Sequence, residues 1–101
     1  MSPQLTATLV DDATPMTLAE LARACRAAEA EVHVWVVEGV LHPIGNSPPE
    51  WRFAGASLRR ARLALTLTRE LEINPPGVAF VLDLMDEIEA LKASLRRRGA
   101  G

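Results

Sequence analysis

Few side chains in this sequence are of the kinds that carry out covalent or metal chemistry. The chain has one cysteine, Cys25, two histidines, His33 and His42, and no tyrosine. Nothing in it matches a Ser-His-Asp set or a glycine-rich phosphate loop. A metal site needs several such ligands close together, and these three residues are sparse. We therefore expect no enzyme, no metal site and no cofactor, and one cysteine cannot form an internal disulfide.

The side chains that could act on a partner are charged, and they are divided along the chain. Residues 1–50 hold seven acidic residues against two arginines, a net charge of −5. Residues 51–101 hold nine basic residues against six acidic ones, a net charge of +3. The candidate partner-binding residues form two acidic groups: Glu29, Glu31 and Glu38, and Asp83, Asp86 and Glu87. For each group the alternative is an ordinary solvated surface.

Length and composition limit the architecture that must position these groups. A chain of 101 residues, 49% of them hydrophobic, is large enough for one core. We expect a single domain over residues 1–101, with short elements in 1–56 and a helical part in 57–101. No apolar run approaches the ~18 residues of a membrane span, and the N-terminus does not resemble a secretion signal. The cytoplasm is the expected location.

The first half of the chain should contain a short strand and two short helices. Leu5–Val10 alternates apolar and hydroxyl side chains, which is typical of an edge strand. Thr17 and Glu20 have the spacing of a capping box and predict a helix start. The apolar face of that helix comprises Leu18, Leu21, Ala22 and Cys25. A second helix, from about Ala28 to Glu38, should end at Gly39, with His33 facing solvent and an inward face of Val32, Trp35 and Val36.

A small wing and a third helix should follow. Val40–Ile44 and Trp51–Phe53 are short extended segments joined by turn residues, which indicates a two-stranded wing. Trp51 and Phe53 point to the same side and should pack on the helices. Ser57 is the expected N-cap of the third helix, Leu58 to about Glu72. The apolar side chains of this helix cover more than half of its circumference, which predicts burial on several sides.

The last helix is the element around which we expect the rest to be arranged. Asn74 can cap its start, prolines are tolerated in its first turn, and it can continue to Gly99. Its first half is apolar all round, which predicts burial on several sides, and the apolar residues there are Val78, Ala79, Phe80, Val81, Leu82, Leu84 and Met85. At ~1.5 Å per residue the helix would be ~36 Å long, more than a compact chain of this length can cover.

The exposed part of this helix should therefore need a partner. A seam with the three-and-four spacing of a coiled coil runs along it: Val81, Leu84, Ile88, Leu91 and Leu95. Acidic residues precede basic ones along the helix, so an antiparallel pair would match opposite charges. We expect a homodimer through this seam. The alternatives are docking of a different partner on the seam, or an ordinary core helix with a solvated charged face.

Two short helices, a wing, a third helix and a long pairing helix make a mainly α architecture, that of MerR-type winged helix-turn-helix proteins. Within that group the sequence resembles the CbpM family of chaperone modulators. The matching segments are TLAELARAC, EGVLHP, WRF and RELEINPPGVAFVLDLMDEIEALK. One departure lies between the first helices, where Arg26, Ala27 and Ala28 stand in place of the family's glycine, apolar residue and hydroxyl cap.

The resemblance implies a function in protein binding. A member of this family would bind the J-domain of a CbpA-like co-chaperone and block its stimulation of a DnaK-type chaperone. J-domains of this kind present a basic helix, to which the acidic groups above are complementary in sign.

The alternative is a DNA-binding regulator of the MerR type. Such a protein would use Arg52, Arg59, Arg62 and the terminal arginines on phosphates. However, a helix that reads DNA needs basic or amide side chains, and the second helix offers Glu29, Glu31, His33 and Glu38. Specific DNA binding is therefore the less favoured prediction.

Overall fold

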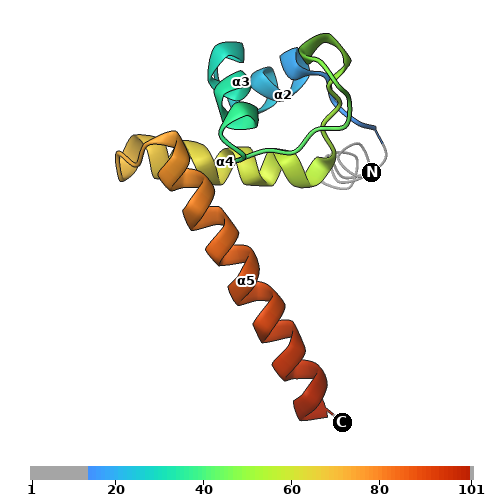
Figure 1. The fold of residues 1–101 in the computed structure, drawn as a ribbon, viewed down its shortest axis with the longest axis vertical. Coiled ribbons are helices and arrows are strands. Elements are labelled where there is room, and N and C mark those ends of the chain that lie inside the picture. The colour runs from blue at the N-terminus through green and yellow to red at the C-terminus, as the bar shows by residue number, and fades with distance from the viewer. Residues whose placement is uncertain (1–13, 101) are drawn as a thin grey trace, which may run out of the picture.

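The computed structural model describes residues 14–100, so the predicted strand Leu5–Val10 lies outside the described part of the chain. Helices dominate the described residues: α2 (Leu18–Cys25), α3 (Glu29–Val37), α4 (Gly55–Glu70) and α5 (Pro75–Ala100), with a short 3-10 helix, η1, at Pro48–Glu50. Helix α2 contacts α3 and α4, while α5 contacts α3 and α4. Figure 1 shows α2 and α3 on one side of α4, with α5 running away from them.

The capping box predicted at the first helix is present. The hydroxyl of Thr17 accepts a hydrogen bond from the backbone N–H of Glu20 at 3.1 Å, and the Glu20 carboxylate accepts one from the Thr17 N–H at 2.8 Å. The bond from the Thr17 N–H lowers the pKa of the Glu20 carboxyl group. The contribution of this carboxylate to stability is therefore present at neutral pH and is lost as the pH falls.

The turn between α2 and α3 forms without the residues that usually shape it. Arg26 takes the left-handed conformation, with φ at 59°, where glycine is the common residue. Ala28 occupies the N-cap position of α3 and has no side chain that could accept a hydrogen bond. Helix α3 is one residue shorter at each end than predicted, and Gly39 follows it with φ at 82°.

The segments predicted as a wing lie next to each other, but only one bridge joins them. Ile44 and Arg52 exchange two backbone hydrogen bonds, at 3.0 and 2.9 Å, as an isolated antiparallel bridge. Phe53 forms a second such bridge with Met16. Trp51 and Phe53 are both buried, at 9% and 0% exposure, and their rings meet edge to face. Their predicted packing on the helices is confirmed, whereas the segments do not form regular strands.

The predicted start and end of the third helix were wrong. Helix α4 begins at Gly55, after Ala54, and Ser57 already lies in the first turn, with its N–H bonded to the Ala54 carbonyl. Ala54 provides the extended N-cap backbone without a capping side chain, so a hydroxyl at position 57 is not needed. The helix ends at Glu70 because Glu72 adopts a φ of 55°, which an α-helix cannot include.

The core lies between α2, α3, α4 and the start of α5. Its largest fully buried side chains are Trp35, Phe53, Leu21, Leu41, Leu82, Val32, Val40 and Val78. Cys25 is buried among them at 6% exposure, and burial raises the pKa of its thiol. It serves as a small apolar core residue, as predicted.

Helix α5 starts as predicted but is not buried as predicted. The side chain of Asn74 accepts a hydrogen bond from the Gly77 N–H at 2.8 Å, which confirms the cap. Of the apolar residues in its first half, only Val78, Ala79 and Leu82 are buried, whereas Phe80 is 66% exposed. The expectation of burial on several sides was wrong because the body covers one face of α5 only. Beyond that contact the helix projects from the body (Figure 1), and the described residues span 46 × 39 × 29 Å.

Within residues 14–100, no helix combines the length and the apolar character that crossing a membrane requires.

The two helix starts lead to a prediction about stability. Ala28→Ser should raise the free energy of unfolding by about 1 kcal/mol, because serine can accept a bond from the first turn of α3. Thr17→Ala should lower it by about the same amount, since it removes the existing cap. Urea denaturation monitored by circular dichroism measures both changes. A serine at position 28 that leaves stability unchanged would show that the turn geometry prevents capping.

Candidate functional site

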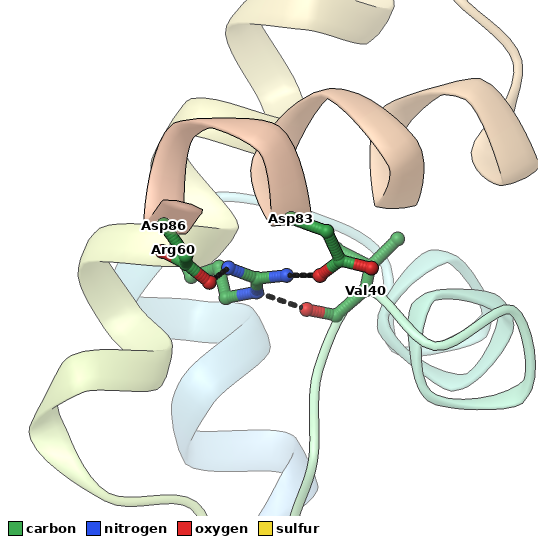
Figure 2. Close-up of polar contacts among 4 residues, drawn as sticks. All are labelled: Val40, Arg60, Asp83 and Asp86. Atoms are coloured by element: carbon green, nitrogen blue, oxygen red, sulfur yellow. Dashed lines mark hydrogen bonds and ion pairs between the residues drawn. The ribbon is translucent and has the colours of Figure 1, made fainter. Parts of the chain in front are cut away.

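Arg60 is the polar centre of the structure. From α4, its Nε donates to the carbonyl oxygen of Val40 at 2.5 Å, its Nη1 to Asp86 at 2.7 Å and its Nη2 to Asp83 at 2.8 Å. Figure 2 shows the guanidinium group between the two aspartates of α5 and the backbone just after α3. The Arg60 side chain is only 17% exposed, while the aspartates are 65% and 70% exposed. One side chain thus links α4, α5 and the chain that leaves α3.

This linkage brings the two acidic groups of the sequence to adjacent elements. Helices α3 and α5 are in contact, and Val40 follows Glu38 by two residues. Two carboxylates share one guanidinium group, so the cluster of Arg60, Asp83 and Asp86 keeps a formal charge of −1. Of the acidic residues of the α3 group, Glu38 is therefore the one nearest along the chain to this cluster.

The six acidic candidates differ in how free they are to meet a partner. Glu29, Glu38 and Glu87 are exposed, and no cation of residues 14–99 lies within ion-pair distance of them. Glu31 is 27% exposed and lies 3.5 Å from Arg69 of α4. Asp83 and Asp86 are bound to Arg60, although most of their surface remains open.

Sequence reasoning missed Arg60. No role was predicted for Arg60, and residue type alone does not distinguish it from Arg59. The available signal was periodicity: Arg60 precedes Ala64 by four residues and Leu67 by seven, and these two are buried and half-buried. An arginine on that face must meet either the core or a carboxylate.

The predicted seam of α5 is open in the structure. Val81 is half-buried, and the others are exposed: Leu84 47%, Ile88 50%, Leu91 63% and Leu95 66%. Plotted at ~100° per residue, these side chains lie on the side of the helix opposite Val78, Ala79 and Leu82, which pack on the body. Phe80 extends the same exposed stripe toward the start of the helix.

Comparisons with known proteins agree with this architecture. Residues 16–97 match the family model described as MerR HTH family regulatory protein. The chaperone modulatory protein CbpM of Coxiella burnetii is 36% identical over 88 residues, which cover 87% of this chain and 83% of the relative. The chain belongs to the CbpM family. A CbpM of Pseudomonas putida is 38% identical over 72 residues, 68% of this chain and 71% of that protein. The family's MerR-like helix-turn-helix is the fold seen in α2 and α3.

The role of Arg60 in this CbpM-family structure can be tested on stability. Arg60→Gln should lower the free energy of unfolding by about 1–2 kcal/mol, because it leaves the Val40 carbonyl and two carboxylates without their shared donor. The expected loss is small because the two aspartates are largely solvated. Arg59→Gln is the matched control: it removes the same charge from the exposed neighbouring residue and should change stability by less than ~0.5 kcal/mol. If urea denaturation shows that both variants lose the same free energy of unfolding, Arg60 does not link α4 and α5 as described.

Proposed function

We propose that this chain is a cytoplasmic chaperone modulator that binds the J-domain of a CbpA-type co-chaperone and inhibits its stimulation of a DnaK-type chaperone. One observation carries the proposal beyond family membership. Helix α3, the second helix of the helix-turn-helix, exposes Glu29, and its C-cap residue Glu38 is exposed as well; neither has a paired cation among the described residues. A basic helix of a J-domain is complementary to this acidic surface.

The alternative is a DNA-binding regulator, which the regulatory description of the matching family model favours. Its candidate phosphate contacts, Arg52, Arg59 and Arg62, are exposed. Against it, α3 contains no arginine, lysine, asparagine or glutamine, and its carboxylates repel phosphate. We therefore place DNA binding second.

A three-part experiment tests the proposal. The purified chain is mixed with the J-domain of a CbpA-type co-chaperone from the same genome, and binding is measured by calorimetry. Inhibition is measured as loss of co-chaperone stimulation of the DnaK ATPase. A gel shift with duplex DNA is run beside them. Salt-sensitive, sequence-specific DNA binding without J-domain binding would reverse our ranking.

The acidic groups give a prediction about association rate. Because oppositely charged surfaces speed encounter and salt screens them within ~8 Å, association with the J-domain should slow as salt rises. Glu29→Lys with Glu38→Lys should reduce the association rate at low salt at least ~ten-fold. The melting temperature should change little, since both residues are exposed and unpaired in the described structure. Stopped-flow fluorescence measures the rate. Unchanged rates at low and high salt would move the contact to Asp83, Asp86 and Glu87 on α5.

We also propose that two copies pair through the α5 seam, antiparallel, so that acidic residues of one helix face basic residues of the other. Leu91→Glu or Leu95→Glu should then abolish the dimer and leave the fold intact, because both residues lie beyond the contact of α5 with the body. Each buried leucine is worth ~1.5–3 kcal/mol and counts twice in a symmetric interface. Analytical ultracentrifugation measures the change. A wild-type monomer at high micromolar concentration contradicts this proposal, and loss of J-domain binding alone would assign the seam to the other partner.

A further inference from the structure

Helix α3 is apolar on two opposite sides, and the described structure covers only one of them. Val32 and Trp35 are buried in the core, at 0% and 1% exposure. Val34 and Val37 point outward and are 40% and 66% exposed. Together with the exposed Ala30 they have the spacing i, i+4, i+7, which places them in one stripe along the outer face. We call Ala30, Val34 and Val37 the outer stripe of α3.

The charges beside the outer stripe are acidic. Glu38 follows Val34 by four residues and lies on one border of the stripe. Glu29 and His33 lie four residues apart on the other side, and the His33 ring is held against Trp51 at a centroid distance of 5.3 Å. Glu31 is turned to the body, where it meets Arg69 at 3.5 Å. Among the residues of α3 and its C-cap, the charges beside the stripe that form no ion pair are therefore negative on both sides.

We infer that the outer stripe of α3 is the apolar centre of a docking surface for a helix that carries small apolar side chains between lysines or arginines. The inference deepens the proposed function, because it names residues and chemistry for the site at which a J-domain would bind. An apolar centre supplies affinity that salt does not screen, and the acidic border selects a basic partner. The stripe spans ~10 Å, about two helical turns, which fits a short helix-to-helix contact.

The same features disfavour two other occupants. DNA would place phosphates beside Glu29 and Glu38, and valines offer no hydrogen bond to a base edge. A second copy of this chain, docked stripe to stripe by a two-fold axis, would set the same acidic borders against each other. Like charges across an interface act against that pairing. A basic helix is the occupant that both the apolar stripe and its borders accommodate.

The test makes the outer stripe more polar while leaving the shape and charge of its side chains almost unchanged. Val34→Thr with Val37→Thr keeps a branched side chain of similar size and similar helix propensity, and the added hydroxyls are at exposed positions. The matched control is Ile44→Thr, because Ile44 is a branched apolar residue that is 79% exposed and lies outside α3. The probe is the purified J-domain of the CbpA-type co-chaperone, titrated by calorimetry at low and high salt.

We expect the double variant to bind at least about ten-fold more weakly at both salt concentrations, because the lost contact is apolar. Its melting temperature should match the wild type, and Ile44→Thr should bind within about two-fold of the wild type. This inference is overturned if the valine double variant binds with wild-type affinity while Glu29→Lys/Glu38→Lys binds more weakly. The proposed function would then still stand. A wild-type chain that does not bind the J-domain overturns the proposed function. If the valine changes instead disrupt self-association in the ultracentrifuge, the occupant is a second copy and the inference of a basic partner is wrong.

Discussion

The attachment of α5 to the rest of the molecule depends on very few residues. Its apolar contact with the body consists of Val78, Ala79 and Leu82, which together span little more than one helical turn. The ion pairs of Arg60 with Asp83 and Asp86 extend the attachment by one further turn. Because the third bond of Arg60 ends on the Val40 carbonyl, the same guanidinium group is fixed by the chain that leaves α3. Arg60 thus joins the long helix to both α4 and the chain that leaves α3, and together with the short apolar contact it attaches α5 to the body.

Two of the helix caps and the buried faces of the short helices could be predicted from the sequence, whereas the burial of α5 could not. The capping box of Thr17 and Glu20 and the Asn74 cap each depend on residues within four positions, and both are present. The order of the helices also follows the predicted pattern. Ser57 was a wrong N-cap because any extended residue, here Ala54, can precede a helix whose first turn is stabilised by packing. Local rules indicate that a helix forms, but tertiary contacts decide where it starts.

In the candidate site, too, local sequence predicted the residues but not their tertiary contacts. Residue type and position were enough to select the acids of α3 and α5, but their state depends on neighbours distant in sequence. Glu31 meets Arg69, and Asp83 and Asp86 meet Arg60, over separations of more than twenty residues. Phe80 was expected to be buried because the first half of its helix is apolar all round, yet the body covers only the opposite face of that helix. The apolar spacing along α5 shows which of its faces are hydrophobic. It does not show which of them packs on α4 and which stays exposed, because that depends on how the two helices lie in space.

Helices α3 and α5 are both apolar on two opposite sides, and their charges indicate which kind of partner each can take. Along α5, acidic residues come first and basic residues last, so an antiparallel copy places opposite signs together. The charge pattern of α5 is therefore complementary to that of an antiparallel second copy. Helix α3 carries acidic residues and no lysine or arginine, so two copies of its outer face repel each other and a basic surface is attracted. If both proposals hold, one MerR-like fold carries two surfaces of different selectivity, because the sign and order of the charges differ while the apolar spacing is alike.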